Sequence, residues 1–299
     1  MATTRRLKRA ASYIAIRAAA GAMAIVPERL ALSIGRIGGR VAWLIAGERR
    51  KLAIRHMRRV AGEEGAEQRA RRMYSQYGRY WAEVLWMRPR RAHGAWKRVT
   101  VEGLDRVLAA RDAGSGMIFA LPHLGNWEIA GTIALHEQIE LLAVAEKLGS
   151  RRLVDWFVEL RNMLGIQIVL ADGTREVFRR MFSMIERGGA VALLSDRDLS
   201  GRGVEVEFFG EKTTLPGGAV SIGMRTGAPV FPVGSFFQEG RGHRVVVGPP
   251  ISIPTEGSPD QRLSAGVQAL AGALEDLVRV APDQWHLLQP NWPSDRALQ

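Results

Sequence analysis

Short hydrophobic runs alternate with helix-like segments from about residue 100 onward. Seven runs have the length of a β-strand: 117–121, 139–144, 166–170, 190–194, 204–209, 230–236 and 244–247. We expect each of them to form a strand, because short apolar runs bounded by polar or turn residues are typical of strands within a sheet.

Helical spacing fills several of the intervals between these runs. In residues 151–164 the large apolar side chains recur at helical intervals: Leu153, Trp156, Phe157, Leu160 and Leu164. Further helices are expected at residues 174–187 and 260–280, and another after Pro216-Gly217-Gly218. This alternation predicts an α/β fold with a largely parallel central sheet flanked by helices on both faces.

The amino-terminal third follows helical rather than strand spacing. Its apolar residues recur at intervals of four, three, four and three: Leu30, Ile34, Ile37, Val41 and Leu44. Arg29, Arg36 and Arg40 lie on one line, about 100° around the same helix. Together with Trp43, this pattern is typical of an amphipathic helix in a bilayer interface. The alternative is that the stripe covers the core of the domain and the arginines face water.

Charge is concentrated in the same region. The net charge is +12, yet residues 1–100 hold 23 Lys and Arg against 6 Asp and Glu, which leaves 19 basic and 24 acidic residues elsewhere. This asymmetry indicates an anionic membrane surface as partner rather than nucleic acid, since no nucleic-acid-binding signature is present. Arginines interrupt the apolar stretches, so neither a membrane span nor a cleaved signal is expected. We predict one domain over residues 1–299, with a basic helical membrane-contacting region at 1–98 and an α/β catalytic core at 99–299.

The candidate chemistry lies in residues 121–128, which read Leu-Pro-His-Leu-Gly-Asn-Trp-Glu. Of the 6 histidines, only His123 has an acidic residue five positions later. Within one helix that spacing separates side chains by about 140°, so His123 and Glu128 can meet only if Gly125-Asn126 forms a turn and cap between them. Glu128 would then hold one ring nitrogen and leave the other to deprotonate an alcohol. The alternative is that His123 bonds a turn and Glu128 faces the helix dipole.

Other catalytic classes fit less well. The chain has no cysteine, which excludes a cysteine nucleophile, and its histidines lack ligand spacing, so no metal site is expected. Residues 219–223 approach the nucleophile elbow of serine hydrolases, but Ala219 replaces the first glycine and Ser221 is expected inside a helix. Residues 121–128 themselves contain no Ser or Cys, so we expect an activated hydroxyl to attack a thioester directly, without an acyl-enzyme.

Three stretches in order resemble one known family. His123–Glu128 resembles the HX4(D/E) motif of glycerolipid-type acyltransferases, although the mannoside enzymes favour Asp where Glu128 stands. Residues 195–199 with 204–210, and residues 283–290, narrow the resemblance to the lysophospholipid acyltransferase branch that includes the lipid A acyltransferases, nearest to the actinobacterial phosphatidylinositol mannoside group. The resemblance implies a peripheral membrane enzyme on the cytoplasmic face of the inner membrane, with an apolar groove for an acyl chain. It implies transfer of palmitoyl from acyl-CoA to a mannose hydroxyl of a glycolipid, with no bound cofactor.

The resemblance also implies roles for single residues. His123 would be the general base and Glu128 its carboxylate partner, whereas Glu146, Arg161 and Glu205 match supporting polar positions.

Several acidic residues compete for a place near His123. Asp196-Arg197-Asp198 follows a strand end, where open α/β sheets bind ligands, and Arg197 either contacts the phosphates of CoA or forms an internal ion pair. Glu205 and Glu207 share one strand face, which borders either a cleft or solvent. Which of Asp196, Asp198, Glu205 and Glu207 supports His123 stays open. So do two other functions: a lipid A-type or lysophospholipid acyltransferase that uses acyl carrier protein, and a non-catalytic protein that binds anionic membranes.

Overall fold

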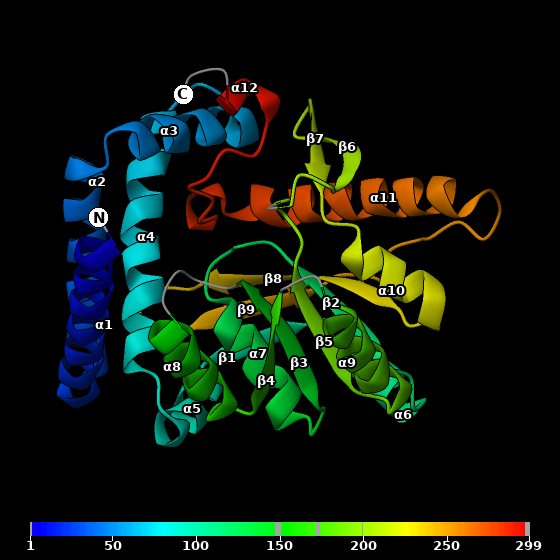
Figure 1. Ribbon diagram of the computed structural model, residues 1–299, viewed down its shortest axis with the longest axis horizontal. Helices are drawn as coiled ribbons and strands as arrows, with labels where there is room; N and C mark the ends of the chain where they lie inside the picture. The colour runs from blue at the N-terminus through cyan, green and yellow to red at the C-terminus, as the bar shows by residue number, and fades with distance from the viewer. Residues whose placement is uncertain (1, 147–150, 172–173, 199, 297–299) are drawn as a thin grey trace.

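The computed structural model describes residues 2–146, 151–171, 174–198 and 200–296 (Figure 1). The amino-terminal region is helical: α1 (Ala2–Ile25), α2 (Glu28–Ile45), α3 (Glu48–Ala61), α4 (Ala66–Trp86) and α5 (Pro89–Trp96). The α/β part follows as β1 (Val99–Glu102), α6 (Leu104–Asp112), β2 (Met117–Leu121), α7 (Trp127–His136), β3 (Leu141–Glu146), α8 (Arg151–Asn162), β4 (Ile166–Ala171), α9 (Arg175–Glu186) and β5 (Ala190–Leu194). It ends with β6 (Val204–Phe208), β7 (Glu211–Leu215), α10 (Gly218–Thr226), β8 (Val230–Phe237), β9 (His243–Val247), α11 (Pro259–Val280), a 3₁₀ turn (Pro282–Gln284) and α12 (Pro293–Arg296).

Most of the described strands form one sheet, in the order β1-β9-β8-β2-β5-β3-β4. Its neighbouring strands run parallel except β8 and β9, so the expected α/β fold is confirmed. β6 and β7 form a separate antiparallel hairpin, so residues 204–209 contribute a strand but not one of the main sheet. β1 and β7 were not expected, because Val-Thr-Val-Glu and Glu-Lys-Thr-Thr-Leu form no apolar run.

The hydrophobic core lies on both faces of the main sheet, and β2 shows how the sequence divides it. Ile118 and Ala120 belong to the core on one face, together with side chains of α9, α10 and α11. Met117 and Leu121 belong to the core on the other face, which includes side chains of α7. All four are buried. β2 is therefore covered on both sides, and its carboxyl end emerges between two layers of helices.

Helix α2 approaches α4 very closely, because glycines line the contact. A Cβ placed on Gly39 would lie 2.0 Å from the carbonyl oxygen of Tyr74, and one on Gly78 would lie 2.0 Å from that of Gly35. A Cβ on Gly35 would also meet Ala82 of α4. The two backbones are therefore in contact, and α1, α2 and α4 stand side by side (Figure 1).

This contact turns the apolar stripe of α2 away from the protein. Its members are 46–68% exposed: Leu30, Ile34, Ile37, Val41 and Leu44. Arg29 and Arg40 are exposed beside them. The alternative in which the stripe covers the core is therefore wrong, because the face of α2 that packs against the protein is a different one, formed by Ala31, Leu32, Gly39 and Trp43.

Two residues of the expected membrane contact lie elsewhere on α2. Trp43 is buried and packs edge-on against Tyr74, with ring centroids 5.5 Å apart, because it stands one turn beyond Gly39 on the inward face. Arg36 is only half-buried. It therefore lies at the boundary between the inward and outward faces of α2. Burial and the nearby positive charge of Arg79 lower the pKa of its guanidinium.

In the part of the chain that the structure describes, no single helix is both long and apolar enough to cross a membrane. α2 and α3 meet that requirement only as a pair, and the chain bends by 105° between them. Tyr13–Ile25 of α1 forms a shorter apolar stretch.

The contact between α2 and α4 predicts opposite responses at two adjacent glycines. Gly39→Ala should lower the free energy of unfolding by about 1–3 kcal/mol, because the new methyl group would collide with the backbone of α4. Gly38→Ala, the matched control, places its Cβ in open space and should raise that free energy by about 0.5–1 kcal/mol. Urea unfolding followed by circular dichroism compares the two; equal responses would contradict the contact.

Candidate active site

Two neighbouring strands place the central pair of functional side chains. β2 and β5 run parallel with Leu121 opposite Leu194. The ladder continues for one residue, because the N–H of Ser195 donates to the carbonyl of Leu121 (2.8 Å). His123 and Asp196 stand two residues beyond the last strand pair. They therefore emerge side by side at the carboxyl edge of the sheet, where open α/β sheets bind ligands.

His123 and Asp196 form a hydrogen-bonded dyad. Nδ1 of His123 lies 2.7 Å from Oδ1 of Asp196, and the backbone N–H of His123 donates to Oδ2 (2.9 Å). The indole N–H of Trp285 also donates to Oδ2 (2.8 Å). The Asp196 side chain is completely buried. These donors therefore replace the water that an exposed carboxylate would bind.

The charge state of the dyad follows from these contacts. Burial alone would raise the pKa of Asp196, but the ring of His123 and the N–H donors outweigh it, so the pKa lies below its usual value. An ionised carboxylate only accepts hydrogen bonds, so in the neutral imidazole of His123 Nδ1 carries the proton and Nε2 has the lone pair. The His123 side chain is 16% exposed, and no described residue is hydrogen-bonded to Nε2. Nε2 is therefore the atom that can take a proton.

Glu128 has a different partner from the expected one. Asn126 caps α7 by accepting the backbone N–H of Glu128 (3.1 Å), so Glu128 does stand in the first helical turn. Its carboxylate, however, accepts hydrogen bonds from Nε and Nη2 of Arg161 at 2.6–3.0 Å. Asp196, not Glu128, holds the ring of His123. The reason is strand register, which joins two residues 73 apart in sequence, whereas the His–Glu spacing is only local.

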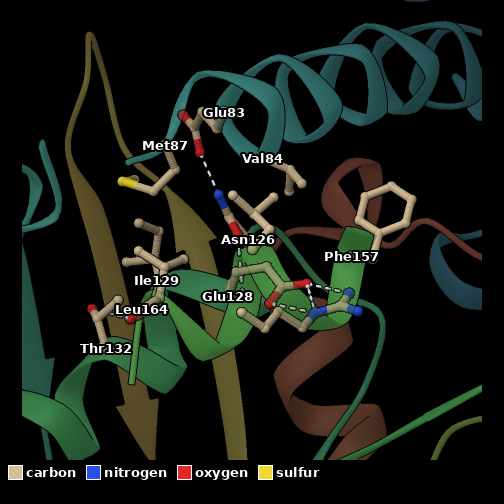
Figure 2. A pocket seen from close by; sticks show the side chains of 11 residues that line it. Glu83, Val84, Met87, Asn126, Glu128, Ile129, Thr132, Phe157 and Leu164 are labelled. Carbon is tan, nitrogen blue, oxygen red and sulfur yellow. Dashed lines mark hydrogen bonds and ion pairs between the residues drawn. The ribbon is translucent and has the colours of Figure 1, made fainter. Parts of the chain in front are cut away.

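Arg161 and Glu128 line a small cavity among α4, α7 and α8. Figure 2 shows Glu128 there with Val84, Ile129 and Phe157 around it. Its apolar lining consists of Val84, Met87, Ile129, Phe157, Leu160 and Leu164. The cavity has a volume of about 10 Å³, which is at the lower limit for a single water molecule. The acyl groove implied by the resemblance is therefore not open at this place in the structure.

Aromatic side chains connect Glu128, which lines this cavity, to the ring of His123. Tyr80 stacks on Trp127 with ring centroids 4.2 Å apart, and Trp127 meets the ring of His123 edge-to-face at 5.4 Å. The Tyr80 hydroxyl donates to Glu128 (3.4 Å). Burial and the neighbouring Glu128 raise the pKa of Tyr80 well above its usual value, so the hydroxyl keeps its proton.

A second buried carboxylate holds the turn between β2 and α7. Glu83 of α4 accepts hydrogen bonds from Asn126 (2.7 Å) and Arg79 (2.8 Å) and lies 2.9 Å from Nε2 of His243. Burial alone would raise its pKa, but His243, Arg79 and Asn126 lower it to about 2. α4 thereby fixes Asn126, the residue at which the turn becomes a helix (Figure 2).

The backbone of the same turn is held by His286. The N–H of His286 donates to the carbonyl of His123 (2.8 Å), and its ring Nε2–H donates to the carbonyl of Gly125 (3.1 Å). Burial lowers the pKa of His286 to about 3, so this ring is neutral. Gly125 has φ +58°, and a Cβ there would lie 2.1 Å from the carbonyl oxygen of Ser235, so only glycine fits.

The residue pattern assigned no role to Glu83, Trp285 or His286. Residues 283–290 stood out only through the family resemblance, and Glu83 belongs to a segment with four arginines and two glutamates but no distinctive motif. Their partners lie 43 to 161 residues away in sequence, which explains why no local signal identified them.

The other expected site residues have mainly structural contacts. Asp198 organises the loop before β6, accepting hydrogen bonds from Ser200, Gly201, Gly203 and Thr214. Glu205 is 70% exposed on the β6–β7 hairpin and pairs with Lys212 (3.1 Å), so this strand face borders solvent. Arg197 is half-buried next to Asp196. The side chain of Glu146 lies outside the described residues.

Two further chemistries are not supported by the geometry. Ser221 lies inside α10 rather than on a strand-to-helix turn, so it does not form a nucleophile elbow. Within the described ranges, no group of three or more His, Asp or Glu side chains is placed to hold a metal ion. The dyad of His123 and Asp196 is the arrangement suited to acyl transfer.

Comparison with known proteins agrees with this geometry. Residues 2–294 match the family described as bacterial lipid A biosynthesis acyltransferase. A Mycolicibacterium smegmatis protein named phosphatidylinositol mannoside acyltransferase is 33% identical over 276 residues, which cover 90% of this chain and 88% of that protein. A Mycobacterium tuberculosis protein of the same name (strain CDC 1551 / Oshkosh) is 37% identical over 223 residues, covering 73% and 68% respectively. The chain therefore belongs to the bacterial lipid A biosynthesis acyltransferase family.

Proposed function

We propose that this acyltransferase moves a long-chain acyl group, palmitoyl, from acyl-CoA to a mannose hydroxyl of a phosphatidylinositol mannoside, at the cytoplasmic face of the cell membrane. The observation that carries the proposal is the dyad, in which a buried Asp196 orients His123 and leaves Nε2 without a described partner. The names of the relatives support the choice of acceptor.

The geometry supports a direct transfer in two steps. Nε2 of His123 takes the proton of the mannose hydroxyl while that oxygen attacks the thioester carbonyl and forms the new C–O bond. Asp196, which accepts the Nδ1 proton, stabilises the resulting imidazolium. The tetrahedral intermediate then expels the CoA sulfur, the C–S bond breaks, and the imidazolium returns its proton to the thiolate. The products are the mannosyl ester and free CoA.

The acyl chain needs an apolar site close to Nε2. The cavity among α4, α7 and α8 has the required lining, and Asn126 and Glu128 of the turn after His123 contribute to it, but its volume of about 10 Å³ is far too small. We propose that the chain enters by displacing α8 from α4 and α7. The Arg161–Glu128 ion pair joins α7 to α8 and would control this opening.

The exposed stripe of α2 supports the membrane location. Large apolar side chains gathered on one helix face are unfavourable in water and typical of a face that contacts lipid or another protein. Arg29 and Arg40 stand exposed beside the stripe, where they would meet anionic headgroups. An enzyme that acylates a lipid needs such a contact to reach its acceptor.

The dyad predicts which substitutions abolish transfer. His123→Ala removes the base, and Asp196→Asn removes the charge that stabilises the imidazolium, so each should lower the rate of palmitoyl transfer at least about hundredfold. Glu128→Gln disturbs the ion pair with Arg161 instead and should retain at least about a tenth of the rate per folded molecule. Mass spectrometry of acylated mannolipid quantifies the products.

The same assay separates the competing functions. Activity only with acyl carrier protein as donor, or only with lysophospholipid as acceptor, would replace the proposed donor or acceptor. If His123→Ala transfers palmitoyl at the wild-type rate, the dyad is not the catalytic centre. Loss of transfer in Glu128→Gln but not in Asp196→Asn would restore Glu128 as the partner of His123.

The membrane face predicts weaker vesicle binding in two distinct ways. Ile37→Glu places a charge in the exposed stripe and should weaken binding to vesicles of any charge at least about tenfold. Replacing Arg29, Arg36 and Arg40 by Glu should weaken binding to anionic vesicles only, and mainly at low salt. Flotation with neutral and anionic vesicles measures both effects.

A matched control is available on another helix. Leu135 of α7 is 52% exposed, close to the 56% of Ile37, so Leu135→Glu makes the same change away from the stripe. We expect it to bind vesicles like the wild type. Equal losses in Ile37→Glu and Leu135→Glu would show that α2 is not the contact.

A further inference from the structure

The carboxy-terminal strap, residues 282–296, returns across the turn that carries His123. The N–H of Gly125 donates to the carbonyl of Gln284 (2.9 Å), and the N–H of His286 donates to the carbonyl of His123 (2.8 Å). Leu124 and Trp285 form an isolated antiparallel bridge between these bonds. The strap therefore pairs with the catalytic turn as a strand would, and it places the Trp285 side chain next to the dyad.

The ring of Trp285 has a fixed position under the turn. It is completely buried, and it packs against Phe209 and Phe208 with ring centroids 5.8 and 6.3 Å away. The ring centroids of His56 and Trp292 lie 6.0 and 6.3 Å from that of Trp285. Aromatic rings from three parts of the chain thus hold the indole in one orientation, with Nε1 aimed at Asp196.

The indole N–H acts on the oxygen of Asp196 that His123 does not reach with its ring. Oδ1 accepts a hydrogen bond from the Nδ1–H of the ring. Oδ2 accepts hydrogen bonds from the backbone N–H of His123 and from the indole N–H of Trp285. A carboxylate held at both oxygens cannot rotate about its Cβ–Cγ bond without losing a charge-assisted hydrogen bond. The donors on Oδ2 also draw negative charge away from the oxygen that faces the imidazole.

We propose that Trp285 is a positioning residue for acyl transfer: its indole N–H, together with the backbone N–H of His123, holds Oδ2 of Asp196 in place and limits the charge that Asp196 presents to the His123 ring. This inference rests on the proposed function of the dyad. It assigns the final segment of the chain, 89 residues away from Asp196, to the chemistry of the site. It goes beyond a packing role, because it depends on one hydrogen atom rather than on the volume of the ring.

The strap contains its own matched control. Trp292 is also completely buried, and its indole N–H donates to the carbonyl of Phe208 (2.9 Å) rather than to the dyad. Trp285→Phe and Trp292→Phe therefore remove the same atoms from the same segment. Only Trp285→Phe removes a donor from the catalytic carboxylate.

The test compares the pH dependence of palmitoyl transfer in the full chain of both variants and the wild type. Without the indole donor, Asp196 attracts the imidazolium more strongly, so His123 stays protonated to higher pH and the acid limb of kcat/KM should move upward by about half a unit or more. In Trp285→Phe, kcat should fall about tenfold while the KM for palmitoyl-CoA stays within about twofold of the wild type. Trp292→Phe should lose thermal stability without any movement of the acid limb.

The positioning role of Trp285 can be refuted separately from the proposed function of the dyad. An acid limb that is unmoved in Trp285→Phe, or moved equally in Trp292→Phe, would overturn the positioning role. If Trp285→Phe does not fold, benzothienylalanine at position 285 keeps the ring shape and replaces the N–H by sulfur, and the same movement of the acid limb is expected from it. Wild-type transfer in both His123→Ala and Asp196→Asn would refute the proposed function itself. Their inactivity together with an unmoved acid limb at position 285 would refute only this inference.

Discussion

The site depends on keeping the Asp196 carboxylate ionised where no water reaches it. Burying an uncompensated carboxylate costs several kcal/mol, so the fold has to supply donors before this arrangement is stable. The donors come from the turn after β2 and from the carboxy-terminal strap, which lie 73 and 89 residues away in sequence. Three distant segments must therefore meet before the carboxylate is satisfied. The hydrogen bond from Nδ1 to Asp196 also turns Nε2 of His123 away from the carboxylate. The contacts that compensate the buried charge therefore also orient the base.

Buried or partly buried carboxylates also join the other elements around the site. Glu83 connects α4 to the turn, Glu128 connects α7 to Arg161 on α8, and Asp295 connects the strap to His56 on α3. Such pairs add little net stability compared with apolar packing, but losing one partner leaves a buried charge and costs about 3–5 kcal/mol. The pair on α8 differs from the rest, because both of its side chains are partly exposed. It is therefore the connection that can open at the lowest cost, beside the cavity that an acyl chain would have to enlarge.

What the sequence could predict depended on the range of the interaction. All seven expected strands exist, because each apolar run carries its own signal, and the helical stripe of α2 was visible for the same reason. The period of the stripe does not say whether the stripe faces the protein or solvent. That depends on the close contact of Gly39 with α4, which leaves the large residues of the stripe on the outward face. For the same reason Trp43 was expected at the membrane surface, although it packs inward against Tyr74 of α4. The partner of His123 was also misjudged, because Glu128 has the right local spacing whereas Asp196 is brought there by the pairing of β5 with β2.

Helix α4 belongs to both halves of the molecule, and this constrains how a lipid acceptor reaches the base. Its Gly78 contacts the backbone of α2, while its Tyr80 and Glu83 contact Trp127 and Asn126 beside the dyad. These residues lie within two turns of one helix, so the apolar face of α2 and the catalytic turn cannot move far relative to each other. If α2 contacts the membrane as proposed, a lipid hydroxyl has to reach His123 from the surface that α2 presents. Because that distance is set by a rigid helix, the reach of the acceptor headgroup, rather than the motion of the protein, would select which lipid hydroxyl is acylated.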